Sequence, residues 1–230
     1  MYLIDKYTKL LLHCDGANAA VAMKDVSGRC HPITFYGNAQ ISTAQKKFGN
    51  ASSRYDGNSD YLTIPNHADF NPGTGAFTID LWVRYYNLTS SNICYCANNG
   101  NDDWTAAYGF EVTSSNFHFY VGPTPTSVGG SWSPVADTWY HIEASRDASS
   151  NVRVFVDGSQ LGSTVNITTN LTNNYQFTIG ARYISSQGGW TRNLDGWIDE
   201  FKFSKGVARH TANFTPGKSP YHYKKTIHNL

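Results

Sequence analysis

Apolar and polar residues alternate over many short stretches of this chain. The clearest stretch is Phe77–Arg84, where every second residue is Phe, Ile, Leu or Val and the residues between them are Thr, Asp, Trp and Arg. Successive side chains of a strand point to opposite faces, so this period of two predicts a strand. Trp139–Ser145 and Val152–Val156 have a similar pattern, and the turn pair Asp157-Gly158 follows. Many short strands, with turn signals about every eight to twelve residues, predict an all-β sandwich or barrel.

The most strongly patterned run lies near the C-terminus. In it, Phe201 and Phe203 share one face of a predicted strand and Ile198 is out of phase with them. Asp199 and Glu200 lie inside this strand. Neighbouring side chains point to opposite faces, so we expect only one of the two carboxylates to face the body of the protein. An inward carboxylate must be paired, hydrogen-bonded or bound to a metal, which makes these two residues the first candidates for chemistry.

The closing segment, IDEFKFSKGVARHTANFTP, resembles the end of the concanavalin A-like, laminin-G-like jelly rolls of phage and environmental virus structural proteins. His210 stands where that family usually has an aromatic residue. The resemblance extends upstream through LLLHCDG, KFGNASSRYDGNSDYLTIP, GAFTIDLWVR, DTWYHIEASRD and VRVFVDG, and so covers Leu10 to Pro220. It implies an all-β jelly-roll sandwich of two antiparallel sheets.

One domain with two short arms fits the length and pattern of the chain. We expect an N-terminal arm over 1–9, a laminin-G-like jelly roll over 10–216 and a C-terminal arm over 217–230. A chain of 230 residues is long enough for one well-buried domain, and no internal repeat divides it. The formal net charge is +1, and the sequence has no basic stripe of the kind that electrostatic nucleic-acid binding needs. No nucleic-acid partner is therefore expected. No apolar run has the length of a membrane span or of a signal-peptide core, so no membrane insertion is expected.

Four cysteines could suggest a metal site, but their spacing argues against one. Cys94 and Cys96 are separated by one residue, whereas zinc knuckles favour two. Two such residues of a strand also stand too far apart for an easy disulfide. We therefore expect buried or free thiols, with a Cys14–Cys30 bridge as the alternative.

The sequence lacks the acid pattern of a glycosidase. Glucanases with this jelly roll carry Glu-x-Asp-x-x-Glu in one strand, whereas Glu111 and Glu143 stand alone on their predicted strands. A retaining glycosidase needs two carboxylates about 5 Å apart. No Gly-x-Ser-x-Gly elbow and no phosphate-binding loop is present either. We expect a protein that is not an enzyme, with glycoside hydrolase as the most distant alternative.

Sugar binding needs exposed aromatic rings flanked by polar side chains. The predicted loops Asn98–Tyr108 and Arg182–Arg192 provide both, and a further tryptophan lies in a Gly/Pro/Ser-rich segment. The candidate residues for contact with glycan or protein are Asp102, Asp103, Trp104, Tyr108, Trp132, Arg182, Tyr183, Trp190 and Arg192. Alternatively, the loop tryptophans cover the sandwich edge or anchor a protein contact. Trp82, Trp139 and Trp197 lie in predicted strands and are assigned to the core or the sheet surface.

The resemblance also implies calcium as a structural ion. Jelly rolls of this superfamily often hold one on the outer face, between the first strand, an Asp-Gly turn and an aspartate of the closing strand. The matching positions are Asp15 or Asp56-Gly57, together with Asp199. The alternatives are that Asp56 makes a turn through its side chain and that Asp199 bonds to a neighbouring loop.

The leading interpretation is a non-enzymatic virion structural or binding module, as capsid decoration or a tail-fibre component. It would present a lectin-like jelly roll to glycan or protein. Its expected partners are other virion proteins, further copies of itself and cell-surface glycan. The two arms would dock on partner subunits by strand addition. The alternative is a free, extracellular carbohydrate-binding domain of a cellular organism.

Overall fold

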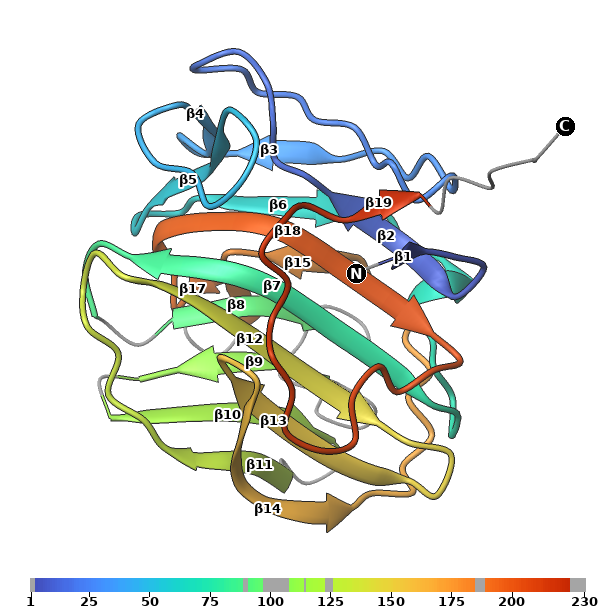
Figure 1. The fold of residues 1–230 in the computed structure, drawn as a ribbon. Coiled ribbons are helices and arrows are strands. Elements are labelled where there is room, and N and C mark those ends of the chain that lie inside the picture. Colours follow the sequence, from blue (N-terminus) through green and yellow to red (C-terminus); the bar gives the residue numbers. More distant parts are fainter. Residues whose placement is uncertain are drawn as a thin grey trace, which may run out of the picture.

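Two antiparallel β-sheets pack face to face in the computed structural model (Figure 1), which describes residues 3–88, 91–96, 108–113, 115–122, 126–184 and 189–223. The helical structure within these ranges is one 3₁₀ turn, η1 (Ala68–Phe70). The predicted all-β jelly-roll sandwich is therefore confirmed. No helix among the described residues is long and apolar enough to cross a membrane.

The eight-stranded sheet has the central strand pair β7–β18. Its order is β14 (Ser159–Asn166), β13 (Asn151–Val156), β12 (Trp139–Arg146), β7 (Phe77–Tyr85), β18 (Asp195–Lys205), β5 (Ser52–Asp56) and β4 (Gln40–Ser42), with β2 (Thr8–Leu12) also paired to β18. Neighbours such as β7 and β18 are far apart in sequence, as jelly-roll connections require.

The seven-stranded sheet covers the other side of the core. Its order is β11 (Thr126–Ser131), β10 (Asn116–Val121), β9 (Tyr108–Val112), β8 (Ser91–Cys96), β15 (Phe177–Ile179), β6 (Tyr61–Ile64) and β3 (Thr34–Tyr36). Two small ribbons complete the described strands: β1 (Leu3–Ile4) with β19 (His222–Tyr223), and β16 (Arg182–Ile184) with β17 (Gly189–Thr191).

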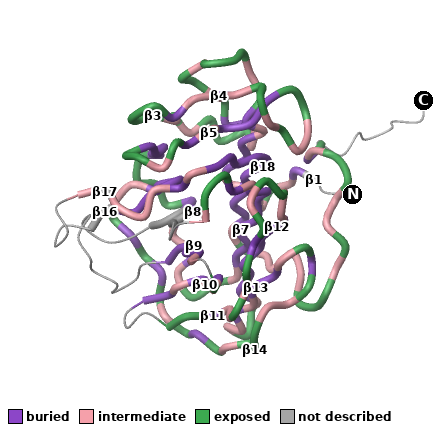
Figure 2. Tube along the Cα trace, turned by 90° about the vertical axis from the view of Figure 1, so that its left-hand side faces the viewer, coloured by how far each residue is buried: buried purple, intermediate pink, exposed green. Residues whose placement is uncertain are grey.

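Aromatic rings from both sheets fill the space between them. Phe203 of β18 lies 5.6 Å from Phe70, 6.0 Å from Phe177 and 6.2 Å from Tyr108, measured between ring centroids. Phe77 of β7 stacks on Phe203 from the same sheet. The long buried stretches of β7 and β18 in Figure 2 mark this core. The alternation of β7 is thus an alternation between the core and the outer face of the sheet.

A β-bulge interrupts β18 and corrects the prediction that Asp199 and Glu200 point to opposite faces: both lie on the outer face, beneath the segments that cover it. Asp199 pairs with Trp82 and Lys202 with Asp80, so two residues of β18, Glu200 and Phe201, lie opposite one residue of β7. Glu200 has a left-handed backbone with φ 51°. The extra residue brings Phe201 into phase with Ile198 in the core, and Asp199 and Glu200 are both buried.

The described parts of the two arms pair with each other. Leu3 and Ile4 form a parallel ladder with His222 and Tyr223, and Ile4 packs with Leu11 and Tyr221 in a small second cluster. The main sheet starts at Thr8, inside the predicted N-terminal arm. Strand addition onto a partner subunit stays a prediction.

The C-terminal segment 206–221, here called the strap, crosses the outer face of β12, β7 and β18 (Figure 1). His210 Nδ1 lies 2.8 Å from Glu143 Oε2, and the Ser145 hydroxyl donates to the His210 carbonyl. Tyr221 donates its phenolic hydrogen to Asp80, and its backbone N–H donates to Glu200. The strap therefore buries charged side chains that would otherwise face water.

The two cysteines whose side chains are described, Cys14 and Cys30, are free thiols. Cys14 is buried, and burial raises the pKa of its thiol well above the ordinary value. The Cys14–Cys30 bridge considered from the sequence is not formed. The side chains of Cys94 and Cys96 lie outside the described residues.

Truncating the core tests this packing. Phe203→Ala removes a fully buried ring that contacts four other rings, and we expect it to lower the free energy of unfolding by about 3–5 kcal/mol. Val135→Ala, at a residue that is 63% exposed, should change it by less than about 0.5 kcal/mol. Urea unfolding measures both. Equal, small effects of the two substitutions would contradict the assigned core.

Candidate ligand-binding groove

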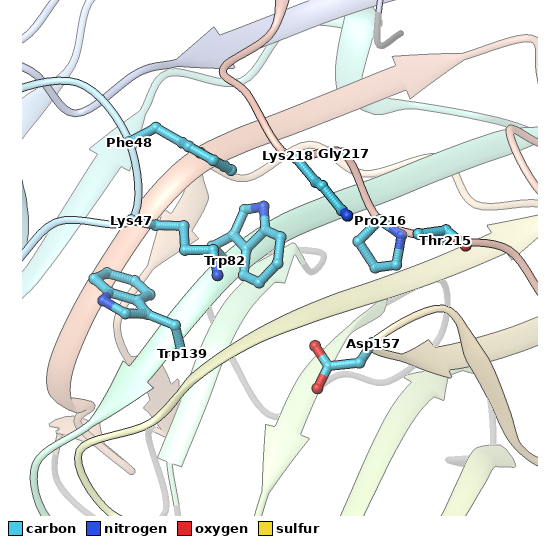
Figure 3. Close-up of a pocket in the computed structure, with 9 residues that line it drawn as sticks. All are labelled: Lys47, Phe48, Trp82, Trp139, Asp157, Thr215, Pro216, Gly217 and Lys218. Carbon is cyan, nitrogen blue, oxygen red and sulfur yellow. The ribbon is translucent and has the colours of Figure 1, made fainter.

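A groove of about 590 Å³ opens on the outer face of the eight-stranded sheet. It is bounded by the loop before β5, by β7 and β12, and by the strap. Its lining residues are Lys47, Phe48, Trp82, Trp139, Asp157, Thr215, Pro216, Gly217 and Lys218. Figure 3 shows Trp82 standing between the Lys47–Phe48 loop and the strap, with Trp139 and Asp157 to either side of it.

Aromatic side chains form much of the groove wall. Trp82 projects from the outer face of β7, opposite the aliphatic face that enters the core. Phe48 meets Trp82 edge to face, with ring centroids 5.8 Å apart. Trp139 is the first residue of β12 and is half-buried. The rings thus combine apolar area with rigid placement, as small-molecule sites commonly do.

Charged groups lie beside these rings. Lys47 Nζ is 3.8 Å from the centroid of the Trp82 ring, a cation–π contact. Asp157, in the turn after β13, accepts a hydrogen bond from the His141 backbone N–H at 2.8 Å. Lys218 reaches the groove from the strap and is exposed. The groove therefore offers ammonium donors and a carboxylate acceptor next to apolar ring faces.

Asp199 binds the backbone of the Lys47–Phe48 loop, here called the groove loop. Its Oδ2 atom accepts the backbone N–H groups of Lys47 at 2.8 Å and Phe48 at 3.0 Å. Burial raises the pKa of Asp199 to about 7; these two hydrogen bonds oppose the rise, and the carboxylates of Glu200 and Asp15 add to it. Within the described part of the chain, Asp199 Oδ1 has no hydrogen-bond partner.

Two predicted arginines meet at one acid on the other sheet. Arg192 forms an ion pair with Glu111, and Arg182 Nη1 lies 3.8 Å from Glu111 Oε2. The backbones of Tyr183 and Trp190 pair across the β16–β17 ribbon, but their side chains lie outside the described residues. Asp102, Asp103 and Trp104 also lie outside them. The predicted loop thus gathers Arg182 and Arg192 at Glu111, whereas its aromatic contacts stay predictions.

Two predicted contact residues take part in the packing of the sandwich. Tyr108 is fully buried, and its hydroxyl donates to the Phe70 carbonyl at 2.6 Å, so the prediction that it meets a ligand was wrong. As the first residue of β9, it faces the core rather than the loop. Trp132 is half-buried and lies edge to face with Tyr140 at 5.0 Å. It packs against the edge of the core, as in the alternative interpretation, and its contact with a ligand stays a prediction.

The calcium residues separate into two places. Asp56 pairs with Asp195, four residues before Asp199 on β18, and the adjoining Gly57 lies against Asp195; this puts Asp56 and Asp199 about 13 Å apart along the strand. Asp56 accepts hydrogen bonds from Asn38 and Asn58, which is the predicted turn role.

Asp15 lies close enough to Asp199 to raise its pKa. The loop facing both carboxylates donates backbone N–H groups: those of Asn50 and Ala51 go to Asp15, and those of two earlier residues go to Asp199. Calcium needs six to eight oxygen ligands. This donor set does not fit a calcium ion, and calcium binding stays an untested prediction.

The sequence suggested that Glu143 stands alone on its strand. In the structure, β12 and β7 place it directly opposite Asp80. Both carboxylates are buried beneath the strap, at 0% and 1% exposure. Asp80 lies 3.2 Å from Lys202 Nζ, and Glu143 pairs with His210. These contacts give the two acids structural partners and keep them out of the groove.

Sequence reasoning assigned Trp82 and Trp139 to the core or the sheet surface and so missed the groove. One available signal was the position of Trp82, a large aromatic residue on the polar face of an otherwise regular strand. The Lys47–Phe48 loop and the strap gave no comparable signal, because their contribution depends on segments distant in sequence meeting at one place.

A family model described as the concanavalin A-like lectin/glucanases superfamily matches residues 56–211. The chain belongs to this superfamily. No curated protein matches the sequence.

Among solved structures, the binding domain of Paraclostridial mosquitocidal protein 1 is 14% identical, with a TM-score of 0.68 over 90% of this chain and 50% of that chain. A structure concerning botulinum neurotoxin type C, whose cell entry depends on interaction with two ganglioside molecules, is 14% identical, with a TM-score of 0.65 over 89% and 49% of the two chains. The binding domain of botulinum neurotoxin DC in complex with SialylT is 14% identical, with a TM-score of 0.63 over 87% and 48%. The chain spans about half the length of these proteins, and the likeness shows the fold alone.

Asp199 generates a pH-dependent prediction. Its pKa rises from 3.8 to about 7 on folding, so its ionised form is disfavoured in the folded chain and its contribution to stability falls as pH increases between these values. At about 1.4 kcal/mol per pKa unit, the loss reaches about 4 kcal/mol. Asp199→Asn cannot ionise, so its stability relative to wild type should increase from pH 4 to pH 8. Urea unfolding across this range measures the difference, and a constant difference would contradict the assignment.

Proposed function

We propose that this chain is a non-enzymatic carbohydrate-binding module whose ligand lies in the groove at Trp82 and Trp139. The observation that carries the proposal is the placement of two tryptophans and Phe48 in one concave site beside Lys47 and Asp157. Sugar rings have apolar faces that stack on aromatic side chains, and hydroxyl groups that pair with charged and polar groups. A concave, mostly apolar site with a few polar groups is the usual form of a small-molecule site.

The number of carboxylates in the groove favours ligand binding over bond cleavage. Asp157 is the one carboxylate among the described lining residues, whereas a glycosidase uses two carboxyl groups on either side of the scissile bond. The neighbouring pair Asp80 and Glu143 is covered by the strap and has partners there. A ligand in the groove therefore meets donors and one acceptor without an acid–nucleophile pair.

The structural neighbours are consistent with this proposal. One of them concerns a neurotoxin that interacts with ganglioside, and another is a neurotoxin binding domain in complex with SialylT. We propose by analogy that a cell-surface glycan is the ligand class for this chain.

We further propose that the module is carried on virus particles, as its resemblance to phage and environmental virus structural proteins implies. Mass spectrometry of purified particles from the source of this chain should then find it in fixed stoichiometry with the other particle proteins. Its absence from particles would leave the free extracellular lectin as the better description.

A glycan array with matched variants tests the binding site. Trp139→Ala removes a half-buried ring of the groove, and we expect it to weaken glycan binding by about tenfold or more, because truncated aromatic contacts dominate small interfaces. Lys47→Ala should weaken it as well. Tyr86→Ala is the control, since this aromatic residue is 59% exposed and is not part of the groove lining.

The array also includes Trp104→Ala and Trp190→Ala, at the loops that the sequence favoured. Loss of binding in these two variants, with Trp139→Ala unchanged, would move the site to those loops and refute the groove. Binding of no glycan by the wild-type protein would reject the carbohydrate function itself. Circular dichroism and thermal melting show whether each variant is folded.

A further inference from the structure

Two histidines and an aspartate converge on one point away from the groove. His67 is the N-cap of η1, and Asp69 lies within that turn. His31 comes from the connection between β2 and β3 and packs against Phe70, with ring centroids 4.9 Å apart. The cluster therefore joins a long connecting segment to a turn far along the chain.

Both histidine side chains contact one carboxylate oxygen of Asp69. Asp69 Oδ2 lies 3.2 Å from His31 Nε2 and 3.2 Å from His67 Nδ1. The three possible ligand atoms are all within 4.8 Å of one another. Metal–ligand bonds of about 2.0–2.1 Å put neighbouring ligands of a tetrahedral zinc ion about 3.3 Å apart. Two of the three separations already have that value.

His67 Nδ1 has two neighbours at this point. The Asp69 backbone N–H lies 3.1 Å from it, and Asp69 Oδ2 lies 3.2 Å from it. A ring nitrogen carries either one in-plane lone pair or one proton, so it can accept from the N–H or donate to the carboxylate, but it cannot do both. A metal ion bound by this lone pair and by Asp69 Oδ2 would join the nitrogen to the oxygen, in place of the hydrogen bond from the N–H. Arg29 Nε lies 3.5 Å from the same oxygen, and its side chain is 46% exposed.

We propose that His31, His67 and Asp69 bind a divalent transition-metal ion of the zinc class. Imidazole nitrogen with carboxylate oxygen is a zinc donor set, whereas calcium takes oxygen ligands. Three protein ligands leave a coordination position for water. The ion would link the β2–β3 connection to η1. This proposal does not depend on glycan binding in the groove.

Zinc titration of the full chain tests the site, after dialysis against a chelator. Isothermal titration calorimetry should find one Zn²⁺ per chain, and added Zn²⁺ should raise the melting temperature. His67→Asn removes the imidazole but keeps a residue type that caps helical turns, so the fold should survive. We expect this variant and Asp69→Asn to lose at least about tenfold in zinc affinity, because even outer partners of metal ligands cost that much.

His222→Ala is the matched control, since His222 is an exposed histidine on β19, outside the cluster. It should bind zinc like the wild-type protein. The proposal is overturned if the wild-type chain binds no zinc, if His67→Asn binds it unchanged, or if His222→Ala is the variant that loses it. Absorption of the Co²⁺-loaded protein gives a second readout, because a tetrahedral imidazole–carboxylate site changes the cobalt spectrum and an outer-sphere ion does not.

Discussion

One extra residue in β18 determines how the outer face of this sandwich is built. Without the bulge, Ile198 and Phe201 would point to opposite sides of the sheet, because they are three residues apart. With it, both enter the core, and Asp199 and Glu200 are buried among the segments that cover the outer face. Glu200 has a left-handed backbone conformation, which residues other than glycine seldom adopt. The bulge therefore carries local backbone strain at this residue.

The two carboxylates hold two different covering segments. Asp199 accepts the backbone of the groove loop at Lys47 and Phe48. Glu200 pairs with His13 at 2.7 Å and accepts the backbone N–H of Tyr221 at 3.0 Å. One irregular position of a central strand thus connects the groove to the strap.

The strap can cover this face because it brings partners for the charges beneath it. Asp80 and Lys202 pair at 3.2 Å, and Tyr221 binds Asp80 and lies over the Lys202 ammonium, 3.6 Å from ring centroid to Nζ. Such a buried network is weak evidence for stability, but the loss of one partner leaves an uncompensated charge. The aromatic groove lies beside the strap, where Trp139 is half-buried and Trp82 keeps 8% of its surface exposed, so the same segment closes one part of the sheet and bounds the site in another.

Regular alternation made β7 and the sandwich predictable from sequence, and the closing motif identified the family. The loop containing Arg182 and Arg192 was also recognised as one unit, and both arginines reach Glu111. The bulge could not be foreseen, because its sequence reads as an ordinary strand with one residue out of phase.

The groove was missed for a different reason. It is assembled from five segments distant in sequence, and each of them alone has a plain structural interpretation. Tyr108 was misassigned because it stands at the boundary between a polar loop and a strand, where the pattern does not show which way the side chain turns.

Comparing Glu200→Gly with Glu200→Val is the most direct test of the bulge. Both variants lose the carboxylate, so they differ mainly in the backbone that residue 200 prefers. The bulge gives this residue a left-handed backbone with φ 51°, which glycine adopts readily and a β-branched residue does not. We expect the glycine variant to be more stable than the valine variant by at least about 1 kcal/mol in urea unfolding. Equal stability, or a more stable valine variant, would show a regular strand at this position and contradict the bulge.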